Sequence, residues 1–306
     1  MKLVRTALIG ASALSLAACA TTGQLAGADA ASDQVAASAT SQDAAHDALF
    51  ALFEDADERS LALNPMSALF RGDMRYADRL GDYLTDEYSD ASRADAELNL
   101  RRLGQIDRSA LNETDQLAYD VFEYDQRQAL KALAPDLLAV TEVRPVNHFS
   151  GFHTFYPGFA SGQSAAPFDT VEDYENNLKR HQNYVELNDR AIARFREGLA
   201  SGVLETQLTI GNVISQLDTQ LAMDIDDSPF WMPVTNFPDD FSEADKSRLT
   251  TEYRASIADI YAAHERMRDF LRDEYYPKAR SSVGLGQMKG GPALYRQLIE
   301  DTTTLP

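Results

Sequence analysis

Apolar residues recur at helical spacing along most of the chain after residue 44, and this pattern does most to set the fold class. The first such segment, 44–63, has apolar residues at Leu49, Leu52, Phe53, Ala56 and Leu61. A period near 3.6 residues places them on one face of a helix. The sequence predicts further helices at about 89–105, 112–133, 170–200, 203–223, 243–276 and 292–300. No segment shows the apolar–polar alternation of strands, so the expected fold is all-α.

Residues typical of helix ends support these boundaries. Asn112 and Ser242 each precede a helical segment and are expected to act as N-caps. Thr170, followed three residues later by Asp173, resembles a capping box with aspartate in place of glutamate. The long helix that begins there is expected to end at a nearby glycine, Gly198 or Gly202.

The segment 135–168 interrupts the helical pattern with four prolines and three glycines. Its centre, 147–159, combines two histidines with five aromatic residues, and we expect it to form a loop. A role in lining a cleft is our hypothesis for five residues there, namely Asn147, His148, Gly151, His153 and Tyr156. Packing in the protein's own core is the alternative interpretation of this segment.

The N-terminal segment 1–18 is typical of a bacterial export signal. Lys2 and Arg5 precede an apolar run that is too short to span a bilayer. The run ends in Leu16-Ala17-Ala18-Cys19, which matches the lipobox of lipoproteins and predicts acylation of Cys19. Residues 19–43 contain few large apolar side chains and are expected to form a flexible tether. The folded domain is predicted to span 44–306, anchored to a membrane surface through Cys19. We expect it to face the periplasm in the cell envelope, at the outer membrane.

The composition excludes several classes of function. The chain has 28 Lys and Arg residues against 48 Asp and Glu residues, a formal charge of -20. Such an acidic chain cannot neutralise phosphates in bulk, so nucleic acid is excluded as the expected partner. The single cysteine excludes an intramolecular disulfide and a cysteine-based metal centre.

No recognisable catalytic or metal motif occurs, and we assign no catalytic residue and no metal ligand in this chain. None of the five histidines forms the His-Glu-x-x-His pattern of zinc peptidases. His181 and His264 lie in predicted helices, where we interpret them as surface residues. The sequence around Ser164 lacks the final glycine and the strand–turn–helix context of a nucleophile elbow.

Several local patterns together resemble one bacterial family, catalogued as domain of unknown function 885. They are Asn64-Pro65-x-Ser67-Ala68 with Gly72-Asp73 and Tyr76-x-Asp78, Asn147-His148-x-Ser150-Gly151 with the run Phe168 to Tyr174, and Gly290-Gly291-x-x-x-Tyr295 with Thr302 to Pro306. The resemblance covers residues 44–306. It implies long helices that form one half of a cleft-enclosing, zinc-peptidase-like architecture, similar to thimet oligopeptidase and angiotensin-converting enzyme. In that family the zinc motif lies in the C-terminal half.

The resemblance implies an enzyme whose zinc site lies outside this sequence. The chain contains no counterpart of the family's zinc motif, so we expect no cofactor in it, and zinc only in the full-length architecture. The leading hypothesis is the N-terminal half of an exported zinc-metallopeptidase-like lipoprotein that acts on peptides, incomplete at its C-terminus and inactive alone. Its expected partners are a peptide substrate and a missing C-terminal half. The alternative is a non-catalytic binding or scaffolding lipoprotein, so enzyme status stays open.

Overall fold

The structure is a computed structural model that describes residues 28–305, with side chains from residue 40 onward. Within that range it is helical and contains no strand, which confirms the predicted all-α class. The α-helices are α1 Ala28–Leu63, α2 Pro65–Phe70, α3 Asp86–Leu103, α4 Glu113–Ala132, α5 Pro135–Thr141, α6 Phe152–Ala160, α7 Val171–Ser201, α8 Gln207–Leu221, α9 Glu243–Phe270 and α10 Gly291–Thr303.

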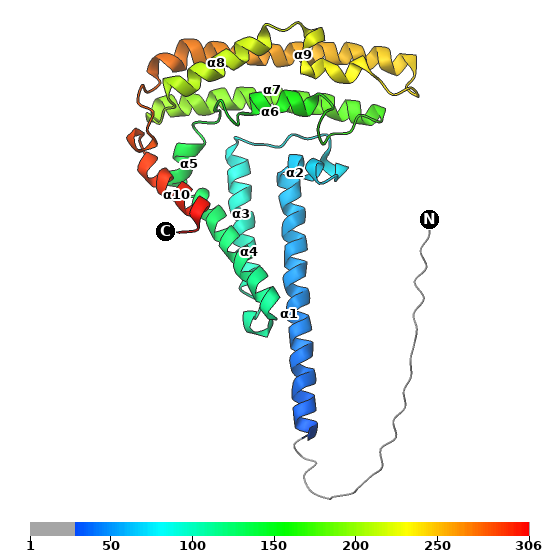
Figure 1. Ribbon diagram of the computed structural model, residues 1–306, viewed down its shortest axis with the longest axis vertical. Coiled ribbons are helices and arrows are strands. Elements are labelled where there is room, and N and C mark those ends of the chain that lie inside the picture. Colours follow the sequence, from blue (N-terminus) through cyan, green and yellow to red (C-terminus); the bar gives the residue numbers. More distant parts are fainter. Residues whose placement is uncertain (1–27, 306) are drawn as a thin grey trace, which may run out of the picture.

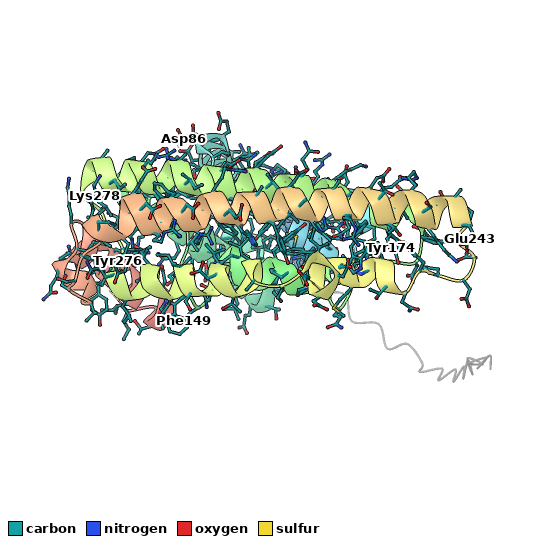
Figure 2. All side chains as sticks on the ribbon, turned by 90° about the horizontal axis from the view of Figure 1, so that it is seen from above. Asp86, Phe149, Tyr174, Glu243, Tyr276 and Lys278 are labelled. Carbon is teal, nitrogen blue, oxygen red and sulfur yellow. The ribbon has the colours of Figure 1, made fainter. Side chains whose placement is uncertain are left out.

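The helices form two parts that lie roughly at right angles (Figure 1). The first part, which we call the slab, consists of α6, α7, α8 and α9. Within it α7 and α9 run side by side in the same direction, and α8 runs the opposite way (Figure 2). The second part, which we call the leg, consists of α1, α3 and α4 and projects away from one face of the slab. Helices α5 and α10 pack together beside the junction.

Helix ends in the slab and leg follow the predicted capping chemistry. The Thr170 hydroxyl accepts the N–H of Asp173 at 3.2 Å, and the Asp173 carboxylate accepts the N–H of Thr170 at 2.8 Å. This reciprocal pair is the predicted capping box. Gly202 ends α7 with φ of 77°, a left-handed conformation that glycine adopts without strain. Asn112 and Ser242 cap α4 and α9, as predicted.

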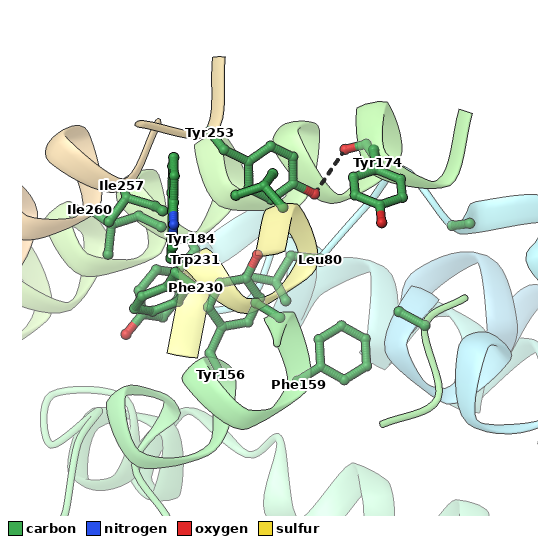
Figure 3. Close-up of a cluster of buried hydrophobic side chains, with 14 of the residues drawn as sticks. Leu80, Tyr156, Phe159, Tyr174, Tyr184, Phe230, Trp231, Tyr253, Ile257 and Ile260 are labelled. Carbon is green, nitrogen blue, oxygen red and sulfur yellow. Dashed lines mark hydrogen bonds between the residues drawn. The ribbon is translucent and has the colours of Figure 1, made fainter. Parts of the chain in front are cut away.

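The buried apolar residues fall into separate clusters, so each part of the molecule has its own core. The largest cluster joins α6, α7 and α9 with the 3₁₀ segment Pro229–Thr235, and includes Tyr156, Tyr184 and Phe230 (Figure 3). A second cluster lies where α7, α8 and the end of α9 meet. The leg core is smaller and contains four aliphatic residues, Leu49, Leu52, Leu103 and Leu111.

The structure differs from the sequence-based boundaries at the start of α1. This helix begins at Ala28, so the second part of the segment predicted as a tether is helical. Alanine is abundant between residues 28 and 48 and has the highest helix propensity, which explains the earlier start. The predicted export signal and Cys19 lie outside the described residues. Among the helices from Ala28 onward, none is both long and apolar enough to cross a bilayer.

Candidate functional site

The segment with the predicted cleft residues begins with a tight turn that positions α6. The Asn147 side-chain carbonyl accepts the N–H groups of Phe149 at 2.8 Å and Ser150 at 2.9 Å. Gly151 follows as the buried N-cap of α6. A Cβ at Gly151 would lie 2.5 Å from the backbone carbonyl oxygen of Asn147 and 2.5 Å from the ring of His153. The turn therefore needs glycine for space at this position.

Residues 152–160 form a helix, although the prolines and glycines there predicted a loop. Pro157 lies inside α6, where it has no N–H to donate to the carbonyl of His153. The Gln220 side chain from α8 donates to that carbonyl instead, at 2.8 Å. Because a neighbouring helix satisfies the freed carbonyl, α6 continues through the proline.

A second glutamine of α8 fixes the His153 ring. The Gln216 amide nitrogen donates to the His148 carbonyl at 3.0 Å, so the amide oxygen faces His153 Nε2 at 2.9 Å. His153 therefore carries its proton on Nε2. Burial lowers the pKa of His153, which keeps the ring neutral near pH 7.

The predicted cleft residues separate into core and surface positions. His153 and Tyr156 are buried, and the Tyr156 ring stacks on Tyr184 with centroids 4.1 Å apart (Figure 3). The cleft-lining prediction is wrong for these two residues in this chain, because the amphipathic face of α6 turns them into the slab core. Gly151 is buried as well, and a cleft role stays a prediction for Asn147 and His148, which are partly exposed.

Two exposed phenylalanines form a pair that we call the aromatic patch, Phe70 and Phe155. Their ring centroids lie 6.2 Å apart, and both rings lie 5.8 Å from the buried ring of Phe159. Phe149, in the turn before α6, is 85% exposed. The segment 147–159 thus divides its aromatic residues between the core and the surface.

His181 and His264 are buried in the slab, so their predicted surface positions are wrong. His181 belongs to an inward-facing stripe of α7 that also contains Asn177, Tyr184 and Asn188, at spacings of three and four residues. His264 Nε2 lies 2.8 Å from the Tyr184 hydroxyl. A stripe of polar residues occupies core positions here, which polarity alone would assign to the surface.

His181 also lies next to a serine, at the distance that separates a catalytic nucleophile from its general base. His181 Nδ1 lies 2.7 Å from Ser256 Oγ, beside a cavity of about 520 Å³ between α7 and α9. Such a pair suggests nucleophilic catalysis only if the histidine accepts the serine proton. The direction of the hydrogen bond therefore decides its chemistry.

The surrounding hydrogen bonds give that direction. The buried Arg180 donates to the Asn177 side-chain carbonyl at 3.1 Å, so the Asn177 amide nitrogen faces His181 Nε2 at 3.2 Å and donates to it. His181 Nε2 is thus the acceptor, and Nδ1 carries the proton and donates to Ser256. Burial, assisted by the Arg180 charge, lowers the pKa of His181 to about 3. This arrangement leaves Ser256 without a base, and the pair is structural.

The described residues do not fit the zinc that the family resemblance implies. A catalytic zinc site needs three protein ligands of the His, Cys, Asp or Glu type. From residue 40 to residue 305, no three such side chains come together in a way that could hold a metal ion. His181 Nδ1 and His264 Nε2 each take part in a hydrogen bond with a neighbouring helix. We therefore assign no step of a reaction to a metal in this chain.

A groove of about 740 Å³ lies in the leg, between α1, α3 and α4. Its floor includes Ala96 of α3, and its walls include Phe53 of α1 and Phe122 of α4, whose rings lie 4.9 Å apart. Leu117 and Val121 of α4 line it and are 64% and 51% exposed. The sequence predicts the helix that carries both residues, at 112–133, but it did not reveal that this face of α4 borders a groove.

Comparison with known proteins identifies a solved structure with a similar fold. No curated protein matches the sequence. Among solved structures, the crystal structure described as "the putative lipoprotein from Colwellia psychrerythraea" matches with a TM-score of 0.68 at 16% identity. At that identity the likeness concerns the fold. The match covers 84% of this chain and 46% of that protein, so the chain spans about half the length of this relative.

The sequence also matches a defined protein family. The family is described as "Bacterial protein of unknown function (DUF885)", and the match extends over residues 65–306. These residues comprise the slab and helices α3 and α4 of the leg, whereas α1 lies before the match. The chain belongs to this bacterial family of unknown function, DUF885.

Proposed function

We propose that this chain is the N-terminal helical half of an exported, zinc-metallopeptidase-like lipoprotein that acts on peptides. The observation that carries the proposal is the fold match, in which most of this chain corresponds to 46% of a protein about twice as long. Membership of DUF885 supports it, because the zinc-peptidase-like architecture is what the sequence resemblance to that family implies. The chemistry then belongs to the C-terminal half.

In this proposal the described residues supply binding surface and rigidity. The buried contacts between α7 and α9 keep these helices in a fixed position. The turn at Asn147 and the aromatic patch lie at the surface, where they would form one wall of a cleft for peptides. None of these residues acts as a zinc ligand or a general base.

The proposal includes a lipid anchor at Cys19 in the cell envelope. The sequence Leu16-Ala17-Ala18-Cys19 supports it, and so does the description of the solved relative as a lipoprotein. Intact-mass measurement of the native protein should show loss of residues 1–18 and an acylated Cys19. An unmodified periplasmic form would contradict the anchor.

The DNA that follows the codon of Pro306 tests the proposal of a half enzyme. A zinc motif in frame, or after one frameshift, supports it, and that region can then be co-expressed with this chain. The two parts together should hydrolyse peptides in a reaction that a chelator abolishes, whereas each part alone should not. A stop codon followed by an unrelated gene would contradict it, and would favour a binding or scaffolding lipoprotein.

A further inference from the structure

The groove of the leg has the geometry of a helical bundle that lacks one helix. Each of its three helices contributes a stripe at spacings of three and four residues, for example Phe53, Ala56 and Ser60 on α1. On α4 and its C-cap the lining residues extend from Thr114 to Leu133, about 30 Å at 1.5 Å per residue. On α1 and the residue that follows it they extend over 53–64, about 18 Å. The groove can therefore receive a helix of roughly 12 to 20 residues.

Two contacts join α1 and α4 at one end of the groove. The rings of Phe53 and Phe122 meet at 4.9 Å, and His46 Nδ1 lies 2.9 Å from the carboxylate of Asp115. These contacts hold the two helices together at one end. Leu117 and Val121 lie on the same stretch of α4 as these contacts, where they line the groove and are exposed to solvent. Toward α2 the helices α1 and α4 diverge (Figure 1). An exposed apolar surface of this kind favours binding of a partner that covers it.

The charge of the groove limits what that partner can be. Its charged lining residues are three aspartates, Asp57, Asp95 and Asp125, and no Lys, Arg or His side chain lines it. Asp57 forms an ion pair with Arg71, and Asp95 forms one with Arg59. The Asp125 carboxylate has no hydrogen-bond or ion-pair partner among residues 40–305; the nearby Arg127 pairs with Glu123 instead. An apolar floor with an unpaired carboxylate at its rim is complementary to a cationic, amphipathic ligand.

We propose that this groove binds one amphipathic helix of a partner protein, with an apolar face flanked by lysine or arginine. The apolar face would cover Leu117 and Val121, and a cationic side chain would pair with Asp125. This is recognition of a helix in a groove, in which residues at spacings of three and four provide the anchors. The proposal does not depend on peptidase activity, because it concerns only residues of the leg.

Two synthetic helices of 18 residues test the charge preference. They share one leucine face, and their polar faces carry lysine in one peptide and glutamate in the other. Fluorescence anisotropy with the purified full chain should show saturable binding of the lysine peptide, with a Kd at least about tenfold lower than that of the glutamate peptide. Higher salt should reduce the difference. Equal binding of both peptides, or no binding, would overturn the proposal.

Matched variants locate the binding. Asp125→Lys and Leu117→Ser should each weaken binding of the lysine peptide by about tenfold. The controls are Asp240→Lys and Leu208→Ser, which alter an exposed aspartate and a leucine of similar exposure, 62%, outside the leg. The controls should bind like the unaltered chain. If all four variants lose binding equally, or if a second copy of the chain occupies the groove and Leu117→Ser abolishes a dimer, the proposal is wrong.

Discussion

Replacing Gly151 with alanine tests how tightly the segment before α6 packs. The added Cβ would lie 2.5 Å from the backbone carbonyl oxygen of Asn147 and from two ring atoms of His153, about 1 Å closer than ordinary contact. Neither neighbour can move freely, because Asn147 closes the turn and Gln216 holds the His153 ring. Overpacking of this kind costs about 1–3 kcal/mol, and alanine is also a poorer N-cap than glycine. We expect Gly151→Ala to lower the free energy of unfolding by about 2–3 kcal/mol.

Gly158→Ala is the matched control, because it introduces the same group into the same helix. A Cβ at Gly158 meets no atom within 4 Å, so alanine should stabilise α6 by about 0.5–1 kcal/mol. Urea unfolding followed by the fluorescence of Trp231, the single tryptophan, reports on the slab core. In thermal unfolding, Gly151→Ala should lower Tm by roughly 5–10 °C. Equal stability of Gly151→Ala and the unaltered chain, or shifts of both variants in the same direction, would refute the packing argument.

Three further predictions concern acid stability, metal binding and association. Burial lowers the pKa of His181 and His264 to about 3, so below pH 6.5 the unfolded chain binds more protons than the folded one. Urea unfolding should therefore show a loss of about 2 kcal/mol per histidine between pH 6.5 and pH 5, and a flat profile would contradict it. Elemental analysis of the purified chain should find no stoichiometric zinc, and peptide assays no hydrolysis; one zinc per chain with metal-dependent activity would contradict this. The aromatic patch should cause self-association or bind a separately expressed C-terminal half, whereas a clean monomer without hydrophobic-dye binding would disprove it.

Local signals in the sequence were sufficient to predict the helices and several of their ends. Thr170 and Asp173 form the capping box that their spacing predicts, and Gly202 ends the same helix. These predictions succeed because a cap depends on residues only a few positions apart. The all-α class follows from the apolar period for the same reason.

Features that depend on distant residues could not be predicted. Pro157 remains inside α6 because Gln220, more than sixty positions along the chain, satisfies the carbonyl that proline leaves free. His181 and His264 are buried with hydrogen-bond partners on neighbouring helices, namely Ser256 and Tyr184, whereas their polarity suggested surface positions. The same limit applies to the candidate sites. The spacing along α4 indicates an apolar face, but only the positions of α1 and α3 show that this face borders a groove.

The separate cores of the slab and the leg have a consequence for how the molecule opens. The leg core has four aliphatic side chains, whereas the main slab cluster unites aromatic residues from several helices with a buried hydrogen-bond network. Amide hydrogens in α3 and α4 should therefore exchange through openings of lower free energy than those in α7 and α9. Such partial opening would let α1, α3 and α4 rearrange around the groove while the slab stays folded. The leg would then be the more flexible part of the chain and the slab the more rigid one.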